Sequence, residues 1–127
     1  MKNLTLLLFL LVALSASAFR VDTVAVPTRH LDSPLEVVVV VPDGASAAAP
    51  ASTVFLLNGF GGCHRDWIDR APRVGELADR FGMVLVCPNG RNSWYWDTDS
   101  MKMESFITRD LVADTDRRFP TLARRDN

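Results

Sequence analysis

Residues 37–41 are five consecutive valines, and this run constrains the fold more than any other feature of the sequence. Valine is β-branched and favours extended backbone, so the run predicts a strand that ends at Pro42. Side chains of a strand alternate between its two faces, so both faces of this strand are apolar. Because such a strand needs cover on both sides, we expect residues 37–41 to lie centrally between two layers.

Shorter apolar runs predict three further strands. Residues 21–26 alternate weakly between apolar and polar side chains, as is typical of an edge strand. Residues 53–57 and 83–87 are compact apolar runs, and turn sequences follow both of them, Asn58-Gly59 and Pro88-Asn89-Gly90.

Two stretches have apolar residues at helical spacing. Residues 71–81 predict a helix that stops at Gly82, since glycine is the usual residue just past a helix end. Residues 102–119 predict a longer helix. Ser100 and Glu104 resemble a helix-start signal, offset by one position from the ideal capping box.

Strand, glycine turn, helix and strand follow one another over residues 53–87, which is the order of a βαβ unit. The pattern predicts an α/β fold with a mostly parallel sheet and flanking helices. A chain of 127 residues, 48% of them hydrophobic, has room for one globular domain. The 14 basic and 15 acidic residues are scattered and leave a net charge of −1, so we expect no nucleic-acid partner.

The first 18 residues predict a secretory signal peptide, because Lys2 precedes an apolar run over residues 4–14 and Ala16-Ser17-Ala18 follows it. The run is shorter than the roughly 20 apolar residues that span a bilayer as a helix, so we expect no stable membrane anchor. Cleavage near Ala18 leaves residues 19–127 as the folded domain of a secreted or periplasmic protein. A buried helix at the N-terminus is the alternative.

Export places Cys63 and Cys87 in an oxidising compartment, where they either form one disulfide or leave Cys87 as a small buried apolar residue. No spacing of cysteine and histidine matches a metal site, and we expect neither metal nor cofactor. A Cys63 thiolate beside His64 is a weak alternative nucleophile, since neighbours on a turn seldom point together. Asp97 and Asp99 predict solvated loop residues rather than a glycosidase pair.

The glycine-rich turn at residues 58–62 is the main candidate for a functional site. A dinucleotide fingerprint needs a third glycine where His64 stands, and a Walker A loop needs a Gly-Lys-Ser/Thr that does not follow. An oxyanion site fits better, because backbone N–H groups after a strand are free to point at a developing negative charge. A tight turn without a ligand is the other interpretation.

The same turn and its flanks, residues 56–67, read Leu-Leu-Asn-Gly-Phe-Gly-Gly-Cys-His-Arg-Asp-Trp. They resemble the Leu-Leu-His-Gly…Gly…His…Trp segment of an esterase family of α/β-hydrolases, the branch with esterase D, tributyrin esterase and antigen 85. Four further segments agree in order, namely Pro42, Val86-Cys87-Pro88-Asn89-Gly90, Ser93-Trp94-Tyr95 and Glu104-Ser105-Phe106-Ile107. The resemblance covers residues 21–127 and implies the N-terminal portion of an α/β-hydrolase fold and a serine carboxylesterase with an acyl-enzyme mechanism.

The resemblance also implies roles for single residues. Phe60 is expected to supply an oxyanion-hole donor through its backbone N–H, with Gly59, Gly61 and Trp94 at the substrate site. Core packing is the alternative role for Trp94.

The same resemblance bears on three further positions in or near the turn. Trp67 is expected to pack a helix against the sheet, and His64 to make a hydrogen bond that stabilises its loop. His64 is not the catalytic histidine, which follows the nucleophile along the chain in this fold. Asn58 replaces the histidine that is common before this glycine.

A serine hydrolase of this fold needs its nucleophile in a Gly-x-Ser-x-Gly elbow, and no serine of the chain stands in one. The family places the strand leading to that elbow after the polar tail at residues 121–127. We therefore expect the oxyanion-hole half of an exported esterase, truncated before the Ser-Asp-His triad and inactive alone.

The expected substrate is a small-molecule or polysaccharide-linked acyl ester, and hydrolysis and acyl transfer both stay open. The rival hypothesis is a non-catalytic exported module that binds carbohydrate or a protein partner through Trp94-Tyr95-Trp96.

Overall fold

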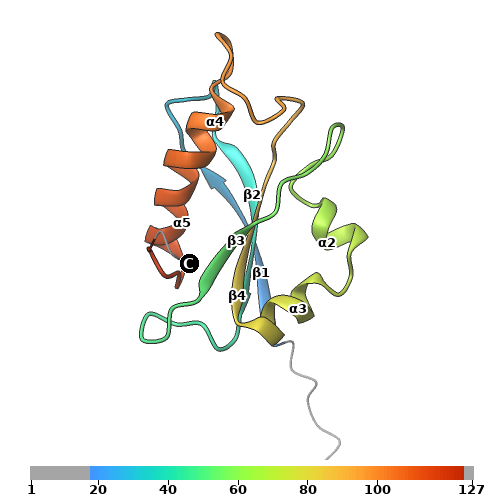
Figure 1. Ribbon diagram of the computed structural model, residues 1–127, viewed down its shortest axis with the longest axis vertical. Helices are drawn as coiled ribbons and strands as arrows, with labels where there is room; N and C mark the ends of the chain where they lie inside the picture. The colour runs from blue at the N-terminus through green and yellow to red at the C-terminus, as the bar shows by residue number, and fades with distance from the viewer. Residues whose placement is uncertain (1–17, 125–127) are drawn as a thin grey trace, which may run out of the picture.

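A computed structural model describes residues 18–124, in which four strands form one sheet with helices on both faces (Figure 1). The predicted signal peptide lies outside the described residues apart from Ala18. The spatial order of the strands is β1-β2-β4-β3. Their bounds are β1 (Phe19–Val26), β2 (Leu35–Pro42), β3 (Ser52–Phe55) and β4 (Met83–Pro88).

The sheet is mixed over these four strands, whereas the sequence analysis predicted a mostly parallel one. β2 runs antiparallel to both β1 and β4, and only β3 and β4 are parallel. The physical reason lies in the connections, since a short link from β1 to β2 forces antiparallel pairing. A helical crossover separates β3 from β4, and a crossover of that kind permits parallel pairing.

The helices form two groups along the chain. α2 (Asp66–Arg70), which was not predicted, and α3 (Val74–Phe81) lie between β3 and β4. A continuous helix of three segments follows β4, namely α4 (Met103–Ser105), the π-helical η1 (Phe106–Leu111) and α5 (Val112–Arg118). α3 ends at Gly82, whose φ of 61° is left-handed, as predicted for a C-cap glycine. No helix within residues 18–124 has the length and apolarity to cross a membrane.

The long helix begins at a different signal from the one predicted. Its N-cap position is Lys102, and neither Ser100 nor Glu104 caps it. Asp97 instead accepts hydrogen bonds from the Ser105 hydroxyl, at 2.6 Å, and from the Ser105 N–H, at 3.0 Å. These bonds lower the pKa of Asp97, which is therefore a helix-start residue and not merely a solvated loop acid.

The valine run of β2 has cover on both faces, as the sequence predicted. Val37, Val39 and Val41 face the long helix and pack in one core with its buried side chains. Val40 faces the other way and packs with α3 and with Leu85 of β4. In Figure 1 the long helix and the α2–α3 pair accordingly lie on opposite sides of the sheet. β2 is thus a central strand and β1 an edge strand, as expected.

As far as residues 18–124 show, no strand pairs with the outer edge of β3 over most of its length. Just before β3, Ala51 donates its N–H to the Pro120 carbonyl and accepts the Leu122 N–H, both at 2.9 Å. Beyond this point β3 pairs only with β4 within the described residues. A groove of about 330 Å³ runs beside this edge, and Thr53 and Phe55 are among its lining residues.

A polar cluster ties the β1–β2 connection to the long helix. Asp110 of η1 lies 2.8 Å from the Nδ1 atom of His30 and also accepts the hydroxyl of Thr28. Burial by itself opposes ionisation of Asp110, but the bonds from Thr28 and His30 outweigh it and lower the pKa. The ionised carboxylate is therefore the form that stabilises the fold.

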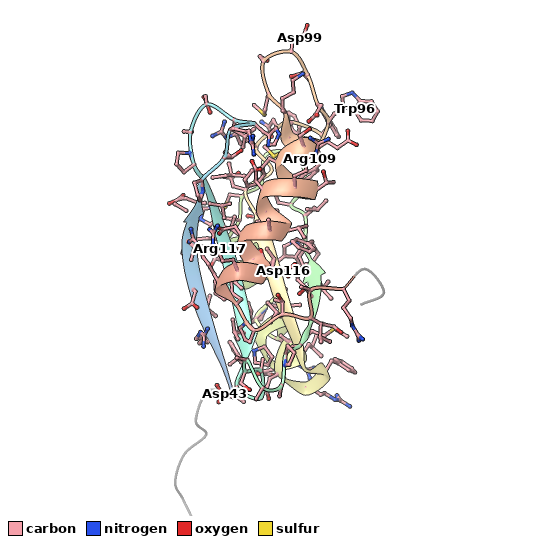
Figure 2. The ribbon with its side chains drawn as sticks, turned by 90° about the vertical axis from the view of Figure 1, so that its left-hand side faces the viewer. Asp43, Trp96, Asp99, Arg109, Asp116 and Arg117 are labelled. Atoms are coloured by element: carbon pink, nitrogen blue, oxygen red, sulfur yellow. The ribbon has the colours of Figure 1, made fainter. Side chains whose placement is uncertain are left out.

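We expect Asp110→Asn to lower the free energy of unfolding by about 2 kcal/mol at neutral pH, because the substitution removes charge-assisted hydrogen bonds. A carboxylate with a lowered pKa in the folded protein stabilises the fold fully above about pH 3.9, which is its pKa in the unfolded chain. This stabilisation is lost as pH falls through the folded-state pKa. The difference between the two proteins should therefore shrink in acid. Urea denaturation over a range of pH measures it. Asp99→Asn, at an exposed loop tip (Figure 2), is the control and should change little.

The two cysteines are free thiols, so the disulfide alternative is not realised in this structure. Cys87 is almost fully buried in β4, and burial raises the pKa of its thiol to about 12. Cys87 is therefore a small buried apolar residue, which was the alternative to a disulfide in the sequence analysis.

We expect Ellman's reagent to modify one thiol per native molecule at about pH 8, because thiolate is the reactive form and Cys87 is both covered and neutral. Cys63 is partly exposed and should react. Denaturant should release the second thiol, and Cys63→Ser should abolish the native reaction. A native protein with no reactive thiol, and two after reduction, would show that the disulfide forms after all.

Candidate functional site

Two loops meet at the carboxyl ends of β3 and β4. Because these strands are parallel, the segments that follow them emerge at the same edge of the sheet. We call residues 58–62 the glycine turn and residues 89–96 the aromatic loop. Both lie at the upper end of the molecule in Figure 1.

Asn58 joins the two loops from a buried position. Its Oδ1 atom accepts the N–H of Gly90 at 2.9 Å, and its Nδ2 atom donates to the Gly59 carbonyl at 2.9 Å. The Tyr95 hydroxyl lies 3.0 Å from both the carbonyl and the Oδ1 oxygens of Asn58. Burial raises the pKa of Tyr95, so the neutral phenol donates this bond. Asn58, which replaces the family's usual histidine, therefore has both polar atoms of its side chain in hydrogen bonds.

Two further hydrogen bonds determine which backbone N–H groups of the glycine turn are free to donate. The N–H of Gly61 donates to the Asn92 side chain at 2.8 Å, and that of Gly62 donates to the Gly59 carbonyl at 3.0 Å. Within residues 18–124, the N–H groups of Gly59 and Phe60 donate to no other group. The donor predicted at Phe60 is therefore available.

The Phe60 ring stacks on the indole of Trp94, with centroids 5.3 Å apart and planes inclined by 26°. The two residues are 68% and 77% exposed. Within residues 18–124, Trp94 therefore does not pack in the core, the alternative role considered for it. The predicted roles of Phe60, Gly59, Gly61 and Trp94 in substrate binding stay predictions.

The backbone of the aromatic loop is strained at three positions. Arg91, Trp94 and Tyr95 have φ values of 50°, 55° and 57°, in the left-handed region that side chains with a Cβ seldom adopt. Such strain persists only where surrounding contacts enforce it. The enforcing contacts include an ion pair of Arg91 with Asp32 at 3.1 Å and a hydrogen bond from the Ser93 hydroxyl to the Gly90 carbonyl at 2.6 Å.

Two hollows flank the glycine turn at Asn58 and Gly59. One, of about 120 Å³, lies against the aromatic loop and is bordered by Phe60, Asn92 and Trp94. The other, of about 270 Å³, lies against α2. The first hollow has room for a small group next to Phe60.

Of two other predicted roles, the role of Trp67 stays a prediction and the role of His64 is wrong. Trp67 lies on α2, is 38% exposed and donates its Nε1–H at 3.2 Å to the carbonyl of Leu57, two residues after β3. The side chain of His64 makes no hydrogen bond to its own loop within the described residues. Its Nε2 atom lies 3.7 Å from the Glu36 carboxylate, and its Nδ1 atom is buried without a partner.

The described residues hold no assembled nucleophile. No serine or cysteine hydroxyl or thiol among residues 18–124 hydrogen-bonds a histidine, and the Cys63 thiol points to Asp66 rather than to His64. The same part of the chain contains no group of three or more histidine, cysteine or acidic residues arranged to hold a metal ion.

The sequence analysis missed the polar network that joins the two loops. Its members are Asn58, Gly90, Asn92 and Tyr95. One signal was present, since an Asn-Gly pair follows each of the two strands, at residues 58–59 and 89–90. The contacts themselves join residues more than 30 positions apart, which local patterns do not report.

Comparison with known proteins finds esterases among the proteins that this chain is similar to. No protein-family model matches the chain. An acetyl esterase of Caldicellulosiruptor saccharolyticus is 34% identical over 77 residues, which are 58% of this chain and 28% of that protein. A ferulic acid esterase structure superposes with a TM-score of 0.74 at 18% identity, over 86% of this chain and 46% of that one. The chain therefore has the α/β-hydrolase fold over the part that it shares with these structures.

A second structural neighbour is named for a thioester substrate instead of a ferulic acid ester. The S-formylglutathione hydrolase of Agrobacterium tumefaciens superposes with a TM-score of 0.72 at 19% identity, over 86% of this chain and 47% of that one. The chain thus spans just under half the length of these structures and about a quarter of the acetyl esterase. At these identities the structures establish the fold alone.

We expect Tyr95→Phe to lower the free energy of unfolding by about 1 kcal/mol, because it removes the hydroxyl bond to Asn58 and keeps the ring. Gly90→Ala should cost more, since a Cβ there would lie 2.2 Å from the Tyr95 hydroxyl oxygen and displace the ring. Gly44→Ala is the matched control, because its Cβ would meet nothing within 4 Å. Urea denaturation measures all three, and equal stability of Gly90→Ala and Gly44→Ala would contradict the close contact.

Proposed function

We propose that this chain is the oxyanion-hole half of an exported serine carboxylic-ester hydrolase. The observation that carries the proposal is the free N–H of Phe60, in a turn after β3 and beside a hollow at the carboxyl edge of the sheet. Backbone donors placed in advance cost no reorganisation when negative charge develops on a substrate oxygen. The esterase relatives support the same class of reaction.

In the proposed reaction, a serine oxygen attacks the acyl carbon of an ester, and a base takes the serine proton. The carbonyl oxygen becomes an oxyanion, and the N–H of Phe60 donates to it. Collapse breaks the bond to the alcohol, which leaves with the proton, and an acyl-enzyme remains. Water then attacks the acyl-enzyme and releases the carboxylic acid.

The proposal takes the Ser-Asp-His triad from outside these 127 residues. No serine of the sequence stands in a Gly-x-Ser-x-Gly elbow, and none in the described part meets a histidine. The open outer edge of β3 and its groove offer a place for a further strand beside the glycine turn. The greater length of the relatives agrees with this arrangement.

The proposed substrate is an acyl ester, either of a small alcohol or linked to a polysaccharide. The relatives named acetyl esterase and ferulic acid esterase act on esters with quite different acyl groups. We also propose that the N-terminal 18 residues direct the protein to the periplasm or outside the cell. The apolar run after Lys2 and the small residues up to Ala18 support this.

The test compares Phe60→Pro with Phe60→Ala in the complete gene product. Proline removes the N–H donor itself, and Gly59 before it tolerates the altered backbone. Alanine removes the ring and keeps the donor. With p-nitrophenyl acetate, we expect Phe60→Pro to lower kcat by about 100- to 1000-fold, the usual effect of losing one oxyanion donor. Phe60→Ala should retain most of kcat.

Two results would overturn the proposal. Equal kcat values for Phe60→Pro and the unmodified protein would remove Phe60 from the oxyanion hole. An intact mass of the native protein that matches residues 19–127, together with no ester hydrolysis, would favour the rival hypothesis of a non-catalytic binding module. Circular dichroism of each variant shows whether the fold is retained.

A further inference from the structure

Three large aromatic side chains stand exposed at the edge of the sheet that carries the candidate site. Phe60 and Trp94 form the stacked pair, and Trp96, two positions further along the aromatic loop, is 68% exposed. Figure 2 shows Trp96 projecting away from the body of the molecule, below the loop tip that carries Asp99. Exposed apolar groups that gather in one region mark interaction sites.

The structure keeps these rings in solvent against two opposing tendencies. Apolar side chains gain free energy by burial, and the backbone at Trp94 and Tyr95 has an unfavourable positive φ. The Tyr95 hydroxyl, bound to the buried Asn58, holds the loop in this conformation. Trp94 and Trp96 flank this anchor on either side in the sequence. The anchored loop therefore presents both rings in a defined place.

We propose that Phe60, Trp94 and Trp96 form a binding surface for a neutral polysaccharide chain. The face of an aromatic ring carries partial negative charge, and the C–H groups on the face of a pyranose ring are weak donors toward it. Phe60 and Trp94 stack face over face, so the exposed indole of Trp94 keeps its outward face for such a sugar. A ring on either side of Tyr95 allows a polymer to make more than one such contact.

Polar groups beside the rings suit the hydroxyl groups of a sugar. Asn92 uses its side-chain oxygen for the N–H of Gly61, which leaves its NH₂ group to donate. Thr98, Asp99 and Ser100 follow Trp96 after Asp97 and are exposed acceptors and donors. A sugar ring with an apolar face and a polar rim matches this combination of aromatic faces and polar side chains.

The charge of this region disfavours an anionic membrane as the occupant. Residues 89–102 contain two bases, Arg91 and Lys102, and two acids, Asp97 and Asp99, so they have no excess positive charge. Arg91 is already paired with Asp32. A protein partner fits less well, because the core of a protein interface is depleted of charged residues and here acids adjoin Trp96.

The inference goes beyond ester hydrolysis, since the surface binds the polymer itself and needs no nucleophile. It also gives the proposed site a substrate class. A chain held on Phe60 and Trp94 lies beside the hollow at the Phe60 N–H, where an acyl group carried by that chain would reach the donor.

Affinity electrophoresis of the native protein tests the proposal with three unesterified neutral polysaccharides, namely xylan, glucomannan and mixed-linkage β-glucan. Trp94→Gly removes the ring and suits the positive φ of that position, and Trp94→Tyr retains an aromatic face. Trp96→Ala tests the third ring. Phe81→Ala is the matched control, because Phe81 is 61% exposed but ends α3, just before the first residue of β4, at the opposite end of the sheet.

We expect retardation in at least one of the polysaccharide gels and a shift in tryptophan emission on binding. Trp94→Gly and Trp96→Ala should each raise Kd by about tenfold, or 1.4 kcal/mol, while Trp94→Tyr and Phe81→Ala stay close to the unmodified protein. No retardation in any gel would overturn the proposal, as would equal retardation of Trp94→Gly. Binding to phosphatidylglycerol vesicles without retardation would assign the surface to lipid instead. The gels contain no ester, so polysaccharide binding can be absent while ester hydrolysis is present, and the reverse.

Discussion

Burial of both faces of β2 is the constraint on which the rest of the structure depends. A strand of five valines has no face for solvent, so one helical layer is required on each side of it. The long helix after β4 covers one face, and α3 covers the other. Since α3 lies between β3 and β4 in the chain, the same demand for cover produces the crossover that makes those two strands parallel.

Parallel pairing of β3 and β4 in turn creates the candidate site. It places the glycine turn and the aromatic loop at one edge, where Asn58 joins them through bonds to Gly90 and Tyr95. Asn58 is buried, so loss of a hydrogen-bond partner would leave a buried polar group unpaired. Such a loss lowers the free energy of unfolding by about 1 to 3 kcal/mol. The network thus makes the conformation of each loop depend on the other, and it sustains the strained backbone at Trp94 and Tyr95.

Both proposals concern Phe60, one through its backbone and the other through its side chain. Within residues 18–124 its N–H donates to no other group, whereas the N–H groups of Gly61 and Gly62 each donate to an acceptor of the two loops. Its ring forms a surface with Trp94. The proposed oxyanion donor and the proposed polysaccharide surface therefore belong to one residue, and a polymer bound by the ring lies close to the donor of the same peptide unit.

The long helix shows how interactions outside an element change its details. The helical spacing of its apolar residues predicted its extent, and Pro120 follows its end. Its start depends on Asp97, and its π-helical segment contains Asp110, which is bound to Thr28 and His30 of the β1–β2 connection. These partners lie outside the helix, in one case some 80 residues away, so the local sequence does not contain them.

The sequence by itself determined the strands, the central place of residues 37–41, the end of α3 at Gly82 and the glycine turn. Each of these follows from local chemistry, since apolar periodicity reports burial and glycine or proline reports a permitted φ. Only the tertiary structure decided the antiparallel pairing of β2 with β4, the free thiols, the exposure of Trp94 and the network at Asn58. Those features depend on which distant segments meet, and a pattern of burial says that a face is covered without saying what covers it.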